Sequence, residues 1–293
     1  MRLDRTISLH LVAPLQGNGA AQGRLPILMY HSISDDAEPG VHPYFRVATS
    51  PQRFAEHLDV LRQHGWKGVS LEEGISELAA ATRAQPKKQV AITFDDGFRD
   101  FHSTAWPLLK DRGFTATMFL ATDFIGSEHR LFKSRPCMTW REISECRRSG
   151  IRFGSHTASH PSLPTLGWDG IERELEASKQ AIERELGEPV VSFAHPYAFP
   201  IERRGYSERF KVLLGRAGYR ISVTTMVGRA TCASDLLCLP RLPVNQEDDA
   251  ALLLGKINGH YDWMCFPQRF LKHRKGWLRM LTLSRGSHRT LVS

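Results

Sequence analysis

The stretch Gln89–Gly97 (QVAITFDDG) decides the fold of this chain. Its first six residues, Gln89–Phe94, form a mostly apolar run with the length of a buried strand. Two carboxylates, Asp95 and Asp96, follow directly. Charged residues are costly in a core, so we expect them at the carboxyl end of this strand, where barrel enzymes place catalytic groups. A solvated Asp-Asp-Gly turn is the alternative interpretation of the motif alone.

Further strand-length runs alternate with helical patterns on both sides of this stretch. The apolar runs cover residues 25–30, 69–71, 115–121, 151–155, 190–194 and 219–224, and the helical patterns cover residues 51–64, 72–83, 99–112, 139–149, 171–186 and 206–217. Ser50-Pro51 marks one helix start, Thr139 with Glu142 forms a capping box, and Gly187 ends the longest helix. This alternation predicts βαβ units around a parallel sheet. A single α/β barrel is favoured over an open doubly wound sheet, because no GxGxxG follows any strand.

The charge of the chain is concentrated at its C-terminal end. The 293 residues carry a formal net charge of +8. No acidic residue follows Asp262, whereas seven basic residues do, namely Arg269, Lys272, Arg274, Lys275, Arg279, Arg285 and Arg289. The preceding body is close to neutral, which argues against a nucleic-acid-binding protein.

These patterns divide the chain into three parts. Residues 1–24 are predicted to be an N-terminal arm and linker, residues 25–248 the barrel, and residues 249–293 a basic, helical C-terminal extension. Apolar and basic residues interleave over about residues 267–283. This composition is typical of a helix at an anionic membrane surface, although a helix packed on the barrel would show it too. We expect a cytoplasmic protein with peripheral contact to the inner membrane, and we favour this location over export.

Two histidines, His156 and His160, follow the strand-like residues 151–155. Side chains four residues apart lie on one face of a helix or turn and can converge on one metal ion. Together with a carboxylate from another strand end, they would leave a coordination position open, as catalytic zinc sites do. Two unrelated surface histidines are the alternative for this motif by itself.

The motifs together resemble those of the polysaccharide deacetylase, or NodB-homology, family. The resemblance rests on TFDDG (Thr93–Gly97), SHTASH (Ser155–His160) and the PY pair at Pro196–Tyr197, and it covers roughly residues 25–245. The segment LMYHS (Leu28–Ser32) is similar to the branch that acts on poly-N-acetylglucosamine. The resemblance implies a distorted (β/α)7 TIM-like barrel and metal-dependent removal of N-acetyl groups from amino sugars.

The resemblance also implies roles for individual residues. Asp95 corresponds to the general base, and Asp96, His156 and His160 correspond to the ligands of one divalent metal ion, zinc by preference. The backbone N–H of Tyr197 corresponds to the donor that stabilises the tetrahedral oxyanion.

The chain departs from the family pattern at two positions. The late histidine motif that supplies a general acid in many members is missing, so the resemblance points to His31, with His195 as the next choice. His195 also stands where many members carry an arginine that pairs with the catalytic aspartate. Arg241 in LPRLPV (Leu239–Val244) is a candidate for that pairing, and a surface arginine is the alternative.

The expected partner is therefore an N-acetylated glycan of a bacterial surface polysaccharide or its precursor. Two other functions fit the same motifs. One is a hydrolase of the same fold that acts on a formamide or a cyclic amide. The other is a glycan-binding protein without catalysis, which would have no need of these four ionisable residues.

Overall fold

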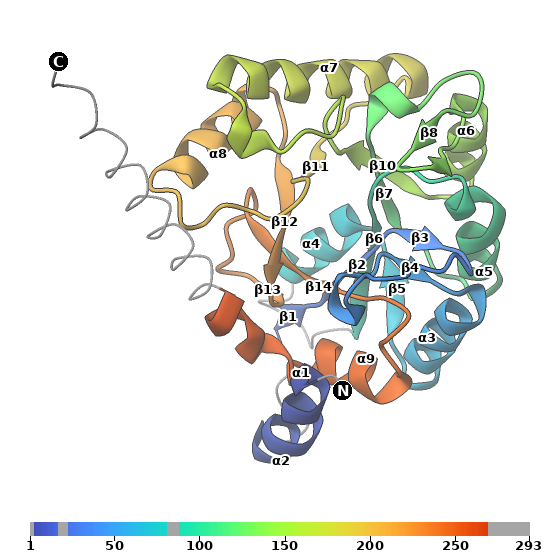
Figure 1. Ribbon diagram of the computed structural model, residues 1–293, viewed down its shortest axis with the longest axis vertical. Helices are drawn as coiled ribbons and strands as arrows, with labels where there is room; N and C mark the ends of the chain where they lie inside the picture. The colour runs from blue at the N-terminus through green and yellow to red at the C-terminus, as the bar shows by residue number, and fades with distance from the viewer. Residues whose placement is uncertain (1–2, 17–22, 81–87, 269–293) are drawn as a thin grey trace, which may run out of the picture.

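The computed structural model describes residues 3–16, 23–80 and 88–268, and they form a closed parallel barrel. Seven strands surround the axis in the order β2 (Ile27–Tyr30), β14 (Leu239–Pro243), β12 (Ile221–Val227), β11 (Ser192–Ala194), β10 (Arg152–Ser155), β7 (Thr117–Leu120) and β6 (Gln89–Phe94). Pairing of β2 with β6 closes the ring. An eighth strand, β5 (Lys67–Val69), pairs with the first half of β6 beside the ring. The predicted α/β barrel is confirmed (Figure 1).

Helices cover the outside of the barrel (Figure 1). They are α3 (Pro51–Gln63), α4 (Leu71–Ala80), α5 (Trp106–Asp111, after a π-helical turn at Phe101–Ala105), α6 (Trp140–Arg148), α7 (Trp168–Leu186), α8 (Tyr206–Arg216) and α9 (Ala250–Asn258). The sequence signals that predicted the helix ends are confirmed by the structure at three helices. The Ser50 hydroxyl accepts the Arg53 N–H, Thr139 and Glu142 form the capping box, and Gly187 ends α7 in the left-handed conformation.

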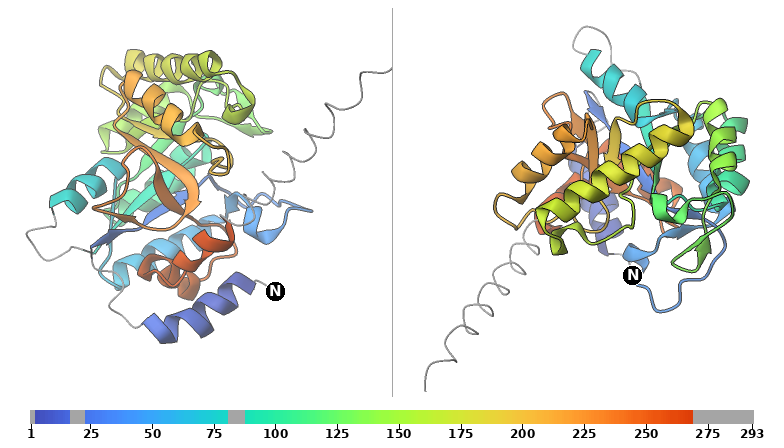
Figure 2. Two further views of the ribbon diagram at one scale, coloured as in Figure 1. Left: turned by 90° about the vertical axis from the view of Figure 1, so that its left-hand side faces the viewer. Right: turned by 90° about the horizontal axis from the view of Figure 1, so that it is seen from above.

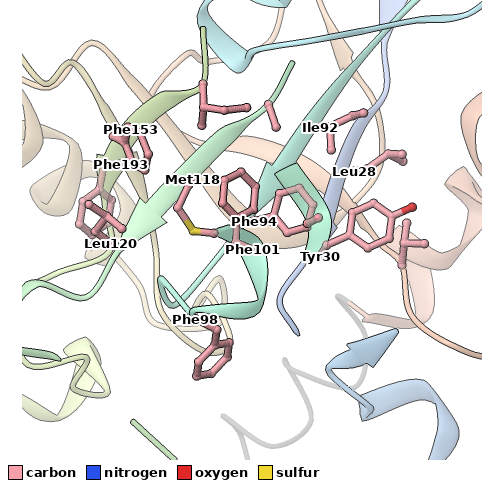
Figure 3. Packing of buried hydrophobic residues seen from close by; sticks show 14 of the residues in the cluster. Leu28, Tyr30, Ile92, Phe94, Phe98, Phe101, Met118, Leu120, Phe153 and Phe193 are labelled. Atoms are coloured by element: carbon pink, nitrogen blue, oxygen red, sulfur yellow. The ribbon is translucent and has the colours of Figure 1, made fainter. Parts of the chain in front are cut away.

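Alternation along β6 sends its side chains to opposite sides of the barrel wall. Ile92 and Phe94 belong to the large apolar layer between strands and helices, where Leu28, Tyr30, Met118 and Leu120 also lie (Figure 3). Ala91 belongs to a smaller cluster with Phe119, Val223 and Leu239. Successive residues of a strand face opposite sides. Asp95 therefore points to the same side as Ala91, at the end of the strand.

Strand β14 is not among the apolar runs that the sequence analysis picked out. Pro240 and Pro243 lack the N–H groups that a ladder needs, which hides the strand in the sequence. It nevertheless pairs with β12 on one side and β2 on the other, with an irregular register between Val223 and Val227. This strand closes the barrel and carries Arg241 inside it.

The N-terminal residues pack against the body. Leu3–Thr6 (α1), the π-helical turn Ile7–Val12 and Ala13–Gln16 (α2) follow one another and lie beside α9 (Figure 2). Arg5 forms an ion pair with Asp249 at 2.6 Å. The Trp263 indole donates to the Ser8 hydroxyl at 2.9 Å. The segment predicted as an arm is thus attached to the start of the predicted C-terminal extension.

Both predicted terminal segments extend outside the described residues. Most of the predicted linker, residues 17–22, lies outside them, whereas Arg24–Leu25 (β1) pairs with Ala230–Thr231 (β13). Within the predicted extension, α9 packs against α3 and a short helical turn follows at Asp262–Met264. The amphipathic helix predicted over about residues 267–283 lies outside the described residues after Gln268.

Candidate active site

The ionisable residues of the deciding motifs meet at the carboxyl ends of the barrel strands. Asp95 and Asp96 follow β6, His31 follows β2, and the loop with His156 and His160 follows β10. Because all ring strands are parallel, these ends share one mouth of the barrel. Asp95, Asp96, His156 and His160 are each at most 5% exposed. The alternatives of a solvated turn and of surface histidines do not describe these buried side chains.

Asp96, His156 and His160 form a group with the geometry of a metal site. Their nearest ligand atoms all lie within 4.8 Å of one another. Oδ1 of Asp96 is 3.5 Å from His156 Nε2 and 3.2 Å from His160 Nε2. Tetrahedral ligands at the roughly 2.0–2.1 Å typical of zinc stand about 3.3 Å apart. The two distances therefore match two edges of such a tetrahedron.

The contacts around these three side chains also fit a metal ion. His156 uses Nδ1 to bond the carbonyl of Ala194 at 2.8 Å, which turns Nε2 toward Asp96. Oδ1 of Asp96 is buried and makes no hydrogen bond of ordinary geometry within the described residues. Burial alone would raise the pKa of Asp96, but the nearby imidazoles of His156 and His160 hold it well below its usual range. An anionic oxygen without an ordinary hydrogen-bond partner, beside two imidazole nitrogens, suits a divalent cation.

The backbone at the site is unusual. Four non-glycine residues of the sequence motifs adopt positive φ, namely Asp96 (78°), Thr157 (70°), His160 (54°) and Tyr197 (55°). Such conformations cost free energy and are retained where the surrounding contacts enforce them. Part of that enforcement is visible in the histidine loop, where the Glu174 carboxylate of α7 accepts the N–H groups of Ala158 and Ser159 at 2.9 Å.

Asp95, at the end of β6, is held by Arg241 of β14, which is separated from β6 in the ring by β2 alone. Nη1 and Nη2 of the guanidinium donate to Oδ1 and Oδ2 of Asp95, both at 2.7 Å. Arg241 is oriented by Nε, which donates to the Thr224 carbonyl at 3.1 Å, and by Nη1, which also reaches the Thr93 hydroxyl. Burial raises the pKa of Asp95, but Arg241 together with the smaller contributions of His156 and His31 outweighs burial, and the net pKa is lowered. Arg241 is 1% exposed, so the surface alternative does not apply.

The two candidate acids lie in different surroundings. His31 Nε2 stands 4.0 Å from Asp95 Oδ2, and 21% of its side chain is exposed. Burial lowers the pKa of His31, and Asp95 partly opposes that effect. His195 is fully buried, with its ring against Phe199 and Phe210. His195 has no exposed surface through which to reach a substrate, so the geometry favours His31.

Tyr197 borders the open side of the site. Its ring lies 4.6 Å from that of His160, and the residue is 51% exposed. In the described part of the chain, no acceptor is bonded to its backbone N–H.

Lys133 is a residue at the site that the sequence analysis did not identify. It lies in the turn of a short hairpin, and its Nζ is 3.5 Å from Asp96 Oδ2. No motif marks it, because the contact depends on how the hairpin folds back over the barrel mouth.

Comparison with known proteins assigns the family. Residues 82–222 match the family model described as polysaccharide deacetylase. The chain carries a polysaccharide deacetylase domain. The domain is that of a hydrolase acting on carbon–nitrogen bonds, and the family resemblance is confirmed. His31, which follows β2, and Arg241, which lies on β14, are outside the matched residues.

Individual relatives extend the comparison over most of the barrel. The deacetylase PplD from Streptococcus pyogenes, solved in complex with acetate, is 27% identical with a TM-score of 0.67, covering 80% of this chain and 98% of PplD. IcaB from Ammonifex degensii is 25% identical with a TM-score of 0.65, covering 80% of this chain and 97% of IcaB. YxkH of Bacillus subtilis (strain 168) is 28% identical over 222 residues, which are 76% of this chain and 72% of YxkH.

Other matched relatives are considerably longer than the region of similarity. The poly-β-1,6-N-acetyl-D-glucosamine N-deacetylase of Staphylococcus aureus (strain N315) is 26% identical over 140 residues, covering 47% of this chain and 46% of that protein.

Proposed function

We propose that this polysaccharide deacetylase removes N-acetyl groups from N-acetylhexosamine units of a bacterial surface polysaccharide or its precursor, using one divalent metal ion. The observation that carries the proposal is the Arg241-held Asp95 beside the Asp96, His156 and His160 set. A general base and a Lewis-acid site adjacent to each other are what amide hydrolysis requires.

The metal set would hold the ion through Asp96 Oδ1 and the Nε2 atoms of His156 and His160. A bound ion supplies Lewis-acid activation of water and of the acetamide carbonyl, and zinc is the metal we propose. Asp95 takes the proton of the attacking water, and Arg241 keeps Asp95 ionised for that purpose.

Two further groups complete the reaction. The Tyr197 N–H donates to the oxyanion of the tetrahedral intermediate, and its positive φ turns the peptide away from a regular strand. His31 delivers a proton to the departing amine. Because its pKa is lowered by burial, His31 is mostly neutral at neutral pH and needs a nearby proton source. Asp95, 4.0 Å away, is that source after it has taken the proton of the attacking water.

The substrate class is inferred from the relatives. One matched relative is named as a poly-β-1,6-N-acetyl-D-glucosamine N-deacetylase, and IcaB is a structural neighbour. The His31 segment, which resembles that branch, lies at the barrel mouth where such a substrate would bind.

The deciding experiment combines metal analysis with product analysis. Purified protein reconstituted with zinc is given N-acetylglucosamine oligomers of graded length and linkage, and the matching N-formyl and cyclic amide compounds. Acetate release, lost in Asp96→Ala, His156→Ala and His160→Ala together with the metal, is the expected result. Formate release alone would indicate a deformylase, and glycan binding without any acid release would indicate a binding protein.

We also propose that the basic residues after Asp262 bring the enzyme to anionic membranes, where surface glycans are assembled. Exposed apolar residues support the idea, because Phe266 is 72% exposed, and Leu11 (59%) and Leu15 (86%) are exposed on the N-terminal helical segment that packs beside α9. No helix among the described residues is long and apolar enough to cross a membrane. Changing Arg269, Lys272, Arg274 and Lys275 to Gln should abolish sedimentation with phosphatidylglycerol vesicles, and unchanged sedimentation would refute the proposal.

A further inference from the structure

A strained hairpin folds over the candidate metal site. Leu131–Phe132 (β8) pairs antiparallel with Arg135–Pro136 (β9), and Phe132 is opposite Arg135, so Lys133 and Ser134 form a two-residue turn. Both turn residues have positive φ, 49° and 65°. Asn and Gly are the residues that adopt this turn at low cost. A lysine at position 133 is therefore conformationally unfavourable in this turn. We attribute its presence there to the contacts of its side chain.

The hairpin is fixed on two sides of the barrel mouth. The Phe132 ring lies 4.9 Å from the His160 ring and 4.3 Å from that of Phe124. Arg135 forms ion pairs with Asp36 at 3.3 Å and Glu38 at 3.7 Å, in the segment that follows His31. The turn between Phe132 and Arg135 is thereby held above Asp96.

The ammonium group of Lys133 is directed to one oxygen of Asp96. Nζ lies 3.5 Å from Oδ2, 4.5 Å from the centroid of the Phe132 ring and 5.4 Å from that of the Tyr197 ring. The two rings favour a cation on their faces and confine Nζ to this position. The other oxygen, Oδ1, faces His156 and His160. The two oxygens of one carboxylate thus have different partners.

We propose that Lys133 is a positioning residue for the metal centre. Its ammonium group occupies Oδ2 of Asp96 and so leaves Oδ1 as the single ligand oxygen. The positive charge of Lys133 also lowers the affinity of the site for divalent ions. The inference rests on the proposed metal-binding role of Asp96, His156 and His160. Because histidine binds a metal ion in its neutral form, a ligand set of one carboxylate and two imidazoles has one negative charge, which the charge of Lys133 offsets.

The sign of the effect follows from the size of the two contributions. Removing the ammonium removes the repulsion between a unit charge, carried by a side chain that is 43% exposed, and a doubly charged ion a few ångströms away at the buried carboxylate. It also leaves the Asp96 side chain freer before metal binding. The entropic cost of ordering that side chain when the metal binds is small, because it has only two rotatable bonds. Loss of the repulsion dominates, so substitution by a neutral side chain strengthens metal binding. It also allows Oδ2 to become a second ligand atom.

The test is a titration of the metal-free, full-length protein with Co²⁺, followed by visible absorption. Lys133→Met should lower the Kd for Co²⁺ at least roughly tenfold, about 1.4 kcal/mol, and should change the visible band because Asp96 can bind through both oxygens. Lys133→Arg, which restores the charge, should stay within about threefold of the parent protein.

Two control variants separate the charge from other effects. Ser134→Gly relieves the strained turn without removing the charge and should leave the Kd unchanged. Lys67→Met removes an equal charge from the first residue of β5, at the opposite end of the barrel, where Lys67 pairs with Glu73. It should also leave the Kd unchanged.

The possible results distinguish this inference from the proposed function. An unchanged or weaker Kd in Lys133→Met would overturn the role of Lys133 while leaving the metal site intact. A parent protein that binds no Co²⁺ would overturn both. Tighter binding in Lys133→Met, with Lys133→Arg and both controls close to the parent, supports the inference whatever the substrate proves to be.

Discussion

The guanidinium of Arg241 on β14 holds both carboxylate oxygens of Asp95 at the end of β6, with two distances of 2.7 Å. Both residues are buried, and 145 residues of chain lie between them. A paired, buried carboxylate is fixed in orientation and stays ionised, as a general base must. The two strands that carry the pair are separated in the ring by β2 alone.

Replacing Arg241 should therefore raise the pKa of Asp95. In Arg241→Gln, the guanidinium no longer opposes the effect of burial on the pKa of Asp95, so Asp95 loses its proton only at higher pH. The acid limb of the pH profile of kcat/KM therefore moves to higher pH. We expect at least roughly a hundredfold loss of kcat/KM at pH 7 and about 3–5 kcal/mol lower stability from the unpaired buried charge. Arg229→Gln removes another buried arginine, paired with Asp262, and serves as the control. An unshifted pH profile in Arg241→Gln would contradict this role.

The roles of the neighbouring carboxylates should separate. Asp95→Asn keeps the shape of the side chain but cannot accept a proton, so we expect a roughly 10²–10⁴-fold lower kcat with bound metal unchanged. Asp96→Asn should lose the metal as well. The measurement is metal content by mass spectrometry alongside acetate release. Full acetate release by the Asp95→Asn protein would refute its assignment as the base.

His31 and His195 give opposite expectations. His31→Gln should bind metal normally and lose about 10²–10³-fold in kcat, because the partly exposed side chain near Asp95 is the one that can reach the amine. His195→Gln disturbs the aromatic packing with Phe199 and Phe210, so it should lower Tm while the remaining folded protein keeps its kcat. If His195→Gln rather than His31→Gln abolished turnover, the acid would have to be reassigned.

His57 predicts how stability changes with pH. Burial lowers its pKa from the ordinary 6.5, although its Nε2 lies 2.6 Å from the Asp248 carbonyl. The folded protein keeps His57 neutral, whereas the unfolded chain binds a proton below about pH 6.5, so stability is full above that pH and is lost as the pH falls toward the lowered value.

The loss amounts to about 1.4 kcal/mol for each unit between the two pKa values. Urea unfolding at pH 7.5 and 5.0 measures it, and His57→Gln should show a smaller difference between the two than the parent protein. The remaining difference belongs to other buried histidines, such as His160. An equal pH dependence in both proteins would show that His57 does not contribute.

Features of the fold that depend only on neighbouring residues could be predicted from the sequence. The apolar run before Asp95, the Thr139–Glu142 capping box and Gly187 at the end of α7 each depend on neighbouring residues, and the structure contains all three. Parallel strands also bring the residues after β6 and β10 to one end of the barrel, so the meeting of Asp96 with His156 and His160 could be expected.

Other features depend on which distant segments pack together. Strand β14 contains two prolines and is recognisable only because β12 and β2 flank it. His195 is buried by Phe199, which precedes α8, and by Phe210, which lies in α8. This burial argues against His195 as the general acid. Lys133 reaches Asp96 only because a strained hairpin is anchored across the barrel mouth.

The sequence by itself thus determined the barrel, the nature of the candidate metal-binding side chains and the family, since these follow from periodicity and short motifs. Only the tertiary structure decided which arginine holds Asp95, which of the two candidate histidines is partly exposed, and which oxygen of Asp96 faces the two histidines. The physical reason is that burial and charge pairing depend on contacts between residues far apart in the chain, and closure of the ring creates those contacts.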